Sequence, residues 1–323
     1  MTTRSPRPPG PSGSPRLRIV MRSYGGENMK DRPSYYTKLV CLASLVRAAR
    51  AVSPTPEIVF VNDGPIPGDR EAVMRAAGEV VRLEAGSNRS SYREAVALAV
   101  GRPWVDTDLV WFGEDDYLYR PDAFRRLLEG AAAAELAEAD YFALYGGSAF
   151  DTSTGRLHAR ERRERGATGD PSAIPLGQVR WYRGLATTSS FGVRRGALVQ
   201  DARLLRLVPF TGGAWDRTTC LTAQGLRPFT RRELVEDLLP FTSQPAPEWP
   251  RSLARGLLRV MLSTRALRRV SRRRVMRSSD PDQICHLELG VLAPGDDWAE
   301  LAQETRAWLD AWHTSAPTGA DQS

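Results

Sequence analysis

The sequence predicts an α/β fold in which helices flank a single open, mostly parallel sheet. With 323 residues, 41% of them hydrophobic, the chain is long enough to bury one large core or two modest ones. From Leu17 onward, short apolar runs alternate with segments of helical periodicity, the pattern of parallel strands joined by crossover helices. The clearest run, residues 108–113, ends directly in three acidic residues, as a strand does where it opens into a loop.

The apolar runs and the turn signals between them give the expected order of elements. We expect strands at residues 17–21, 57–61, 79–83, 108–113, 141–145 and 185–193. We expect helices after Pro33, from Ser90 or Ser91 to Ala99, from Pro121, after Gly196, around 215–221, and over 251–277 and 296–312. Residues 152–177 are rich in Gly and charge, and this composition is typical of a mobile loop.

These elements suggest four parts along the chain. Residues 1–16 and 316–323 are polar tails, rich in residues such as Pro, Ser and Gly at the amino end. Residues 17–240 would form the main α/β domain, and residues 241–315 a helical C-terminal extension. No apolar run approaches the ~20 residues of a membrane span, and no apolar leader follows Met1, so we expect a cytoplasmic location.

Charge and cysteine content exclude few functions. The net charge is +7, and Lys30 and Lys38 are the only lysines among 45 basic residues. Such a balance attracts nucleic acid, anionic membrane or a phosphorylated small molecule, and does not choose among them. The three cysteines have no metal-type spacing, so we expect small buried side chains rather than ligands or disulfides.

The acidic triplet Glu114, Asp115 and Asp116 is the most informative feature of the sequence. In open α/β sheets, ligands bind beyond the carboxyl ends of the strands, where this triplet is expected. Three adjacent carboxylates repel one another, and Mg²⁺ or Mn²⁺, held together with substrate phosphates, would compensate that charge. A solvated acidic turn is the alternative.

The order and spacing of three motifs indicate a resemblance to a known enzyme family. A strand ending in Asn62-Asp63-Gly64, a helix containing residues 88–95 and a strand ending in the triplet resemble the GT-A glycosyltransferases, within them the family-2-like enzymes. The resemblance covers about residues 17–225 and implies a GT-A-like fold. It also implies that Asp63 holds the nucleobase, that Asp115 contacts the donor and that Asp116 is a direct metal ligand. Glu114 takes the first acidic place of the family's Asp-x-Asp motif.

Several other residues can extend this nucleotide site. Ser23 and Tyr24 follow the first strand and can line the pocket, with Tyr24 stacking on the base, although a structural tyrosine is an equal alternative. Arg89 and Arg93 lie near a helix start, where a diphosphate can meet both arginine and backbone N–H groups. Exposed helical arginine is the alternative for this pair.

Asp216 and His286 complete the candidate site. Asp216 follows a glycine turn and opens a helix, the position at which inverting GT-A enzymes carry their general base; an N-cap is the alternative. His286 lies among apolar residues, where a packed histidine is common, but some GT-A enzymes complete the metal site with a C-terminal histidine. An imidazole ligand would tilt the preference toward Mn²⁺.

The resemblance therefore implies an inverting, metal-dependent enzyme that moves a sugar from a nucleoside-diphosphate donor to an unidentified hydroxyl acceptor. The sequence shows no Ser/His/Asp or Cys/His arrangement and no Walker-type phosphate loop. A sugar-phosphate nucleotidyltransferase shares the architecture and is an alternative. Such enzymes favour a glycine-rich basic loop after the first strand, a pattern that residues 25–30 match only weakly. A non-enzymatic basic adaptor is the other alternative.

Residues 251–277 carry ten arginines and no acidic residue. A helix of this kind either packs its apolar side on the domain or lies peripherally on anionic lipid at the inner face of the membrane. We favour packing, because the segment lacks the Trp or Phe that anchors interfacial helices. We expect no nucleic-acid partner.

Overall fold

The computed structural model describes residues 15–27, 29–145, 148–149, 173–213, 215–242, 245–268, 273–293 and 298–315. Its main sheet has the strand order β3-β2-β1-β4-β10-β6-β11-β9-β7, with β8 paired to β9, and a small second sheet pairs β5 with β12. The strands are β1 (Leu17–Tyr24), β2 (Glu57–Asp63), β3 (Glu79–Leu83), β4 (Leu109–Glu114), β5 (Tyr117–Tyr119), β6 (Tyr141–Ala143), β7 (Ser148–Ala149), β8 (Ile174–Leu176), β9 (Val179–Ala186), β10 (Phe191–Arg194), β11 (Met276–Asp280) and β12 (Ile284–His286).

Parallel pairing unites the strands that carry the predicted motifs. β1 lies between β2 and β4 and is parallel to both, and β3 extends the parallel set beyond β2. β10 runs antiparallel between β4 and β6, whereas β6 and β11 are again parallel. The carboxyl ends of β1, β2 and β4 therefore meet at one edge of the sheet.

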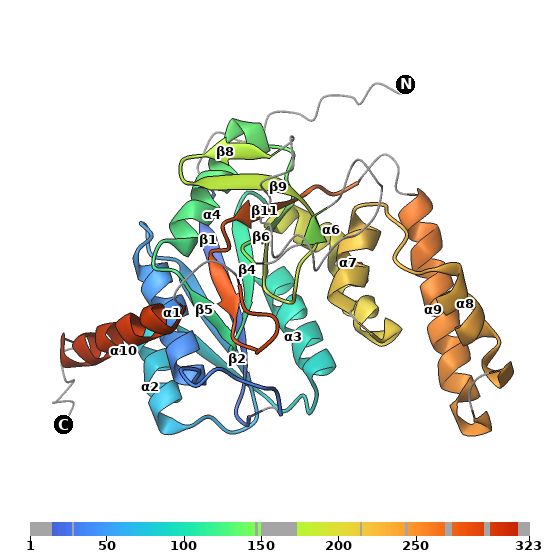
Figure 1. Ribbon diagram of the computed structural model, residues 1–323, viewed down its shortest axis with the longest axis horizontal. Helices are drawn as coiled ribbons and strands as arrows, with labels where there is room; N and C mark the ends of the chain where they lie inside the picture. Colours follow the sequence, from blue (N-terminus) through green and yellow to red (C-terminus); the bar gives the residue numbers. More distant parts are fainter. Residues whose placement is uncertain are drawn as a thin grey trace.

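Helices cover both faces of this sheet (Figure 1). The described helices are α1 (Lys38–Arg50), α2 (Gly68–Ala77), α3 (Asn88–Gly101), α4 (Ala123–Ala132), α6 (Arg195–Leu207), α7 (Trp215–Ala223), α8 (Arg231–Leu238), α9 (Trp249–Arg268) and α10 (Trp298–Ser315). Short 3-10 turns occupy η1 (Ala134–Leu136), η2 (Val208–Thr211), η3 (Pro240–Thr242) and η4 (Ala246–Glu248).

Side chains of the central strands alternate between two cores, as the period of a strand requires. Ile19 and Met21 of β1 join the core under α1, α2, α4 and α10, whereas Val20 joins the core under α3, α6 and α7. α8 and α9 form an antiparallel pair at the side of the molecule (Figure 1) and attach to α6 and α7 through a smaller apolar cluster that includes Leu204 and Leu262.

The predicted fold class is confirmed: the chain forms an α/β fold with a largely parallel central sheet flanked by helices, and helices are prominent in its C-terminal part. The predicted C-terminal extension is not helical throughout, however. β11 inserts between β6 and β9 of the main sheet, and β12 pairs with β5, so this part of the chain completes both sheets.

Three local expectations need correction. The strand expected at 185–193 is the end of β9, a connection and the start of β10. The helix expected over 251–277 is α9, which ends at Arg268, because the apolar periodicity gives way to the buried strand β11. The cap of α3 is Ser87, whose hydroxyl accepts from the backbone N–H of Ser90, rather than Ser90 or Ser91.

Two further expectations concern the loop and the cysteines. Of the expected loop at 152–177, residues 152–172 lie outside the described residues, and residues 174–176 form β8. All three cysteines are buried and free, as the sequence predicts. Within the described parts of the chain, every helix is too short or too polar to cross a bilayer.

Candidate functional site

The site lies where β1, β2 and β4 end. Strand register places Tyr24 beside Asp63 and Arg22 beside Glu114. Glu114 is the last residue of β4, and the next two carboxylates form the turn into β5. The topology therefore brings the acidic triplet and the predicted nucleobase residue to one edge, as parallel α/β sheets do for ligand sites.

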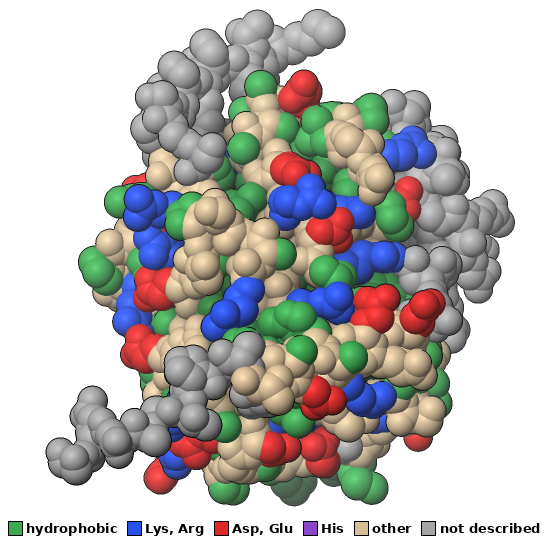
Figure 2. All heavy atoms as spheres, turned by 90° about the vertical axis from the view of Figure 1, so that its left-hand side faces the viewer, with side chains coloured by type: hydrophobic (Ala, Val, Ile, Leu, Met, Phe, Trp, Pro, Cys, Tyr) green, Lys and Arg blue, Asp and Glu red, His purple; other side chains and the backbone are tan. Residues whose placement is uncertain are grey.

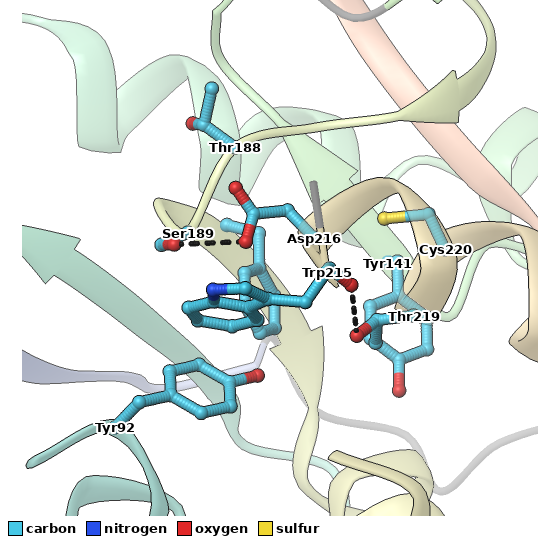
Figure 3. Close-up of a pocket in the computed structure, with 9 residues that line it drawn as sticks. Tyr92, Tyr141, Thr188, Ser189, Trp215, Asp216, Thr219 and Cys220 are labelled. Carbon is cyan, nitrogen blue, oxygen red and sulfur yellow. Dashed lines mark hydrogen bonds between the residues drawn. The ribbon is translucent and has the colours of Figure 1, made fainter. Parts of the chain in front are cut away.

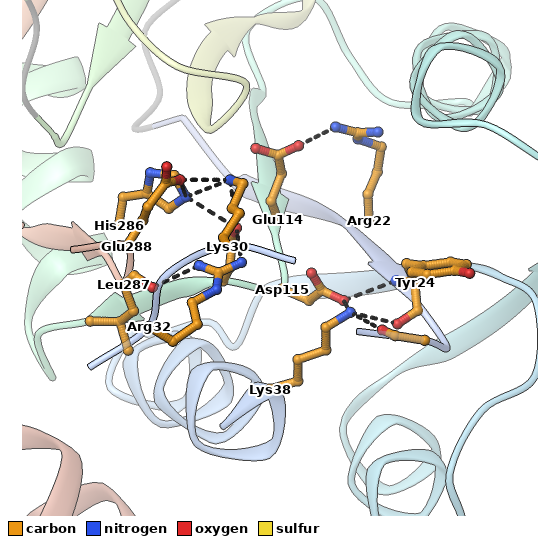
Figure 4. Close-up of polar contacts among 12 residues, drawn as sticks. Arg22, Tyr24, Lys30, Arg32, Lys38, Glu114, Asp115, His286, Leu287 and Glu288 are labelled. Carbon is orange, nitrogen blue, oxygen red and sulfur yellow. Dashed lines mark hydrogen bonds and ion pairs between the residues drawn. The ribbon is translucent and has the colours of Figure 1, made fainter. Parts of the chain in front are cut away.

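Glu114 is paired with a buried arginine. The Arg22 guanidinium, from the neighbouring strand, donates to the Glu114 carboxylate and also to the backbone and side-chain oxygens of Asn88, at 3.2 and 2.6 Å. Figure 4 shows Glu114 directed at Arg22 and away from His286. Burial raises the pKa of Glu114, and the charge of Arg22 opposes that rise.

Asp115 is paired with Lys38, the first residue of α1. The Lys38 ammonium lies 2.9 Å from Asp115 Oδ2 and also donates to the backbone oxygens of Tyr24 and Gly26, at 2.8 and 2.6 Å. The backbone N–H of Tyr24 donates to the same carboxylate oxygen at 2.9 Å. Burial raises the pKa of Asp115, while Lys38 favours its charged form. This pair fixes the loop after β1 against the start of α1.

Asp116 meets three basic groups, Lys30, Arg32 and His286, each of which is labelled in Figure 4. Its Oδ2 lies 3.0 Å from His286 Nε2, 3.0 Å from Arg32 Nη2 and 3.4 Å from Lys30 Nζ. Burial alone would raise the pKa of Asp116, but the hydrogen bond from His286 and the charges of Lys30 and Arg32 outweigh burial and hold that pKa well below its ordinary value. Asp116 is therefore ionised throughout the physiological range.

A two-stranded sheet brings His286 to this position across 170 residues of sequence. β12 pairs antiparallel with β5, so that His286 lies opposite Tyr117, the residue after Asp116. The His286 and Tyr117 rings stack with centroids 4.7 Å apart, and the N–H of Leu287 donates to the backbone oxygen of Asp116 at 3.0 Å. Pairing, stacking and hydrogen bonding together fix the imidazole beside the carboxylate.

The donor set of Asp116 and His286 fits a divalent ion that takes its remaining ligands from a diphosphate. Magnesium sites are commonly built in this way from one or two protein groups and substrate phosphates, and an imidazole nitrogen suits manganese. Within the described residues, no three acidic, His or Cys side chains form a metal cage by themselves. Lys30 Nζ lies 3.3 Å from His286 Nε2, so a cation already faces both candidate ligands, and a bound metal would require this ammonium to move aside. Glu114, expected among the ligands, instead faces Arg22.

The predicted nucleobase end lies beside the triplet. Tyr24 has 53% of its surface exposed, and the Lys38 ammonium lies 5.3 Å from the centre of its ring, so part of this ring is open to a ligand. Asp63 Oδ1 accepts from the backbone N–H of Ala85 at 2.8 Å, which gives this carboxylate a turn-stabilising role. Ser23 is buried and donates to Asn62 Oδ1 at 2.5 Å, so its hydroxyl supports the strand ends rather than lining the pocket.

Gly25 is the point of closest contact between the loops after β1 and β2. A Cβ atom at Gly25 would lie 1.6 Å from the backbone oxygen of Pro65, a distance no side chain can occupy. The N–H of Gly25 also donates to the backbone oxygen of Asp63 at 3.1 Å. Glycine at this position therefore sets the distance between Tyr24 and Asp63.

Asp216 lies in a separate small pocket at the start of α7 (Figure 3). The pocket, about 10 Å³, is near the size of one water molecule, and Asp216 Oδ1 accepts from the Ser189 hydroxyl at 3.2 Å. Beside it, Trp215 packs edge-on against Tyr92 of α3 with ring centroids 4.5 Å apart. Burial raises the pKa of Asp216 to about 6, against the opposing effects of the Ser189 hydrogen bond and the Arg22 charge. A carboxylate of this kind can accept a proton near neutral pH.

Arg89 and Arg93 face a different part of the molecule from the one predicted. Both guanidinium groups lie over the ring of Phe210 in η2, each 5.0 Å from its centroid. Among the described residues, the Lys and Arg side chains that contact the triplet are Arg22, Lys30, Arg32 and Lys38. Sequence reasoning missed these four, although one signal was present: the only two lysines of the chain are among them.

Comparison with known proteins adds three structural likenesses. Neither protein-family models nor curated proteins match the sequence. The bifunctional glycosyltransferase WbbM is 10% identical with a TM-score of 0.42, over 94% of this chain and 52% of WbbM. S. aureus TarS 1-349 in complex with UDP is 15% identical with a TM-score of 0.36, over 64% of this chain and 54% of that one. CMP:2-keto-3-deoxy-manno-octonic acid synthetase complexed with CTP is 15% identical with a TM-score of 0.37, over 92% of this chain and 99% of that one. Likenesses this distant carry no argument about activity, which rests on the site itself.

The contact at Gly25 leads to a stability prediction. Gly25→Ala should lower the free energy of unfolding by about 1–3 kcal/mol, because the new methyl group meets rigid backbone and forces the two loops apart. Gly68→Ala at the start of α2 is the matched control: its Cβ meets nothing within 4 Å, so stability should stay within about 1 kcal/mol of the parent. Denaturant unfolding of both variants provides the measurement. Equal stabilities would contradict the packing described for Gly25.

Proposed function

We propose that this chain transfers a sugar from a nucleoside-diphosphate donor to a hydroxyl acceptor, with inversion and with Mn²⁺ or Mg²⁺ as cofactor. The observation that carries the proposal is the cation-rich carboxylate cluster around Asp116 at the carboxyl ends of the parallel strands. A diphosphate needs concentrated positive charge and a fixed orientation, and both are available at this edge of the sheet.

The donor would lie along the ends of β1, β2 and β4. Tyr24 offers an exposed ring for the base next to Asp63, and Lys30 and Arg32 offer donors for the diphosphate. Asp116 and His286 would hold the metal, which when bound neutralises charge on the departing diphosphate. Arg22 and Lys38 keep Glu114 and Asp115 in place around the donor.

Asp216 would be the general base. In the proposed step, the acceptor hydroxyl gives its proton to Asp216 while its oxygen bonds to the anomeric carbon of the donor sugar. The bond from that carbon to the diphosphate oxygen breaks, and the nucleoside diphosphate leaves with the electron pair. Burial supports this role because it raises the pKa of Asp216 to about 6, which makes the ionised carboxylate a stronger base than an exposed aspartate.

The nucleotidyltransferase alternative has less support. That reading depends on the loop after β1 holding a nucleotide triphosphate with its basic residues. Residues 25–30, which correspond to that loop, hold one basic residue, Lys30, and one acidic residue, Glu27, so they offer little net positive charge for a triphosphate. The expected cytoplasmic location is retained as part of the proposal, as is the four-part division of the chain, in which residues 241–315 supply His286 to the site that residues 17–240 otherwise form.

The first prediction concerns the metal. Asp116→Asn should abolish the Mn²⁺-dependent part of the thermal stabilisation given by a nucleotide sugar, because one of two protein ligands is lost. The measurement is a thermal-shift screen of UDP-, GDP- and dTDP-sugars with Mn²⁺ or with EDTA. Asp310→Asn, on the exposed side of α10, is the control and should behave like the parent. An Mn²⁺-dependent shift of parental size in the Asp116 variant would refute the ligand assignment.

A second prediction separates chemistry from donor binding. Asp216→Asn should reduce kcat by about 10²- to 10⁴-fold, the range typical for a general base, and leave the donor Kd within about twofold of the parent. Turnover and donor titration on the same preparation measure both quantities. If kcat falls less than about tenfold, Asp216 is a helix cap and another group accepts the proton.

The third prediction is a pH profile. Asp216 must be ionised to accept a proton, so kcat/KM should be constant at neutral pH and fall below pH about 6, approaching tenfold per unit at lower pH. The raised pKa places this loss at a higher pH than an exposed aspartate would. Rates from pH 5 to 8, with unfolding followed in parallel, test it. A flat profile down to pH 5 would exclude Asp216 as the base.

A further inference from the structure

A second hollow lies between α3, η2 and α9, outside the donor site. It is a groove of about 590 Å³ lined by Arg89 from α3, Phe210 and Gly212 from η2 and the turn after it, and Arg251, Arg255 and Leu258 from α9. The lining positions 251, 254, 255 and 258 are spaced as one face of a helix. The proposed donor site does not use this groove.

Positive charge in the groove exceeds the negative charge near it. Among the described residues, no carboxylate forms an ion pair with Arg89 or Arg251, and no acidic residue lines the groove. Arg255 is paired, but it shares the single carboxylate of Asp237 with Arg259, at 2.6 and 2.9 Å. The groove therefore carries uncompensated cations that an anionic ligand would satisfy.

This charge pattern differs from that of the face drawn in Figure 2. Figure 2 shows the face that lies on the left of Figure 1, where Lys or Arg side chains are interspersed with Asp or Glu. In the groove, arginines surround the half-exposed ring of Phe210, which also holds Arg89 by a cation–π contact at 5.0 Å. Arginine binds phosphate through paired N–H donors, so the chemistry of the lining favours phosphate.

Residues close in sequence relate two walls of the groove to the proposed active site. Arg89 follows Asn88, which accepts from Arg22, and Arg22 in turn pairs with Glu114 of the triplet. On the other wall, Gly212 lies in the turn that leads directly into Trp215 and Asp216. Both walls of the groove are therefore close in sequence to residues of the proposed site, and one of these residues is the proposed base.

We propose that this groove is an anion subsite that binds a phosphate group of the acceptor. The proposal rests on the glycosyltransferase function and assigns the substrate class of its acceptor side: a hydroxyl compound that also carries phosphate. Arg89 and Arg251 bind the phosphate, and Arg255, held by Asp237, completes the basic wall. An acceptor without a phosphate group would not make these contacts.

The phosphate can belong to a soluble acceptor or to a lipid headgroup. The neighbouring surface gives the lipid source a physical basis that the sequence did not predict. Trp249, at the first position of α9, is 37% exposed and its ring lies 6.4 Å from that of the exposed Phe241, and Leu253 and Leu257 continue the apolar side of the helix. Only Leu258 and Leu262 of α9 join the apolar cluster with α6 and α7, so packing uses part of its apolar surface.

Binding of inorganic phosphate tests the groove without any nucleotide sugar. In isothermal titration at constant ionic strength, Arg89→Gln/Arg251→Gln should weaken phosphate binding about tenfold or more relative to the parent. Arg203→Gln/Arg268→Gln removes the same charge from exposed positions of α6 and α9 that do not line the groove, and should retain parental affinity. Equal phosphate affinities in the two double variants would overturn the proposal, as would undetectable phosphate binding by the parent.

A donor titration of the same variants keeps this test separate from the proposed function. Nucleotide-sugar binding should be unchanged in both double variants, because neither touches the Asp116 cluster. Failure of every nucleotide sugar to bind the parent would refute the donor assignment while leaving the phosphate result intact.

Vesicles then distinguish the two sources of phosphate. Co-sedimentation with phosphatidylglycerol vesicles, but not phosphatidylcholine vesicles, that is reduced by the groove variant and not by its control would support a headgroup-linked phosphate. A parent that binds inorganic phosphate yet stays in the supernatant with both vesicles supports a soluble phosphorylated acceptor. If both double variants sediment to the same extent and bind phosphate with the same affinity, the groove binds neither a headgroup nor a soluble phosphate.

Discussion

Separate neutralisation of three adjacent carboxylates is the constraint around which this site is organised. Two unit charges about 4 Å apart repel by about 4 kcal/mol at an effective dielectric constant of 20, so an uncompensated triplet at the end of a buried strand would be costly. The chain places a different cation beside each carboxylate: Arg22 beside Glu114, Lys38 beside Asp115, and Arg32 with Lys30 beside Asp116. Each cation comes from a different place around β4, and each therefore also fixes the position of its own segment.

The three pairs explain why distant parts of the chain converge. Arg22 extends from β1 to Asn88 and so holds the start of α3, whereas Lys38 holds two backbone oxygens of the loop after β1 against α1. His286 reaches Asp116 only because β12 pairs with β5. The site is consequently complete only when residues from both ends of the chain have docked on the sheet.

Local patterns were sufficient to predict the parallel core. Strand positions at 57–61 and 79–83, the carboxylates at the end of β4 and the helical start at Asp216 all follow from periodicity and turn chemistry, which act within a few residues. The sequence could not specify partners across long separations. It did not reveal that Arg22 pairs with Glu114 or that Arg89 and Arg93 turn to Phe210. Nor did it reveal that a strand of the main sheet begins at Met276, within the stretch expected to be helical. Those outcomes depend on tertiary packing, which composition and spacing do not encode.

The concentration of lysine in one place has a practical consequence. The sequence contains 45 basic residues, of which only Lys30 and Lys38 bear a primary amine on the side chain, and both contact the acidic triplet. The side chain of Lys38 is 3% exposed, whereas that of Lys30 is 38% exposed. Apart from the α-amino group, an amine-selective acylating reagent therefore has one accessible target, and it lies at the centre of the site. The extent of acylation at Lys30, read by peptide mass spectrometry, becomes a direct measure of whether that position is covered.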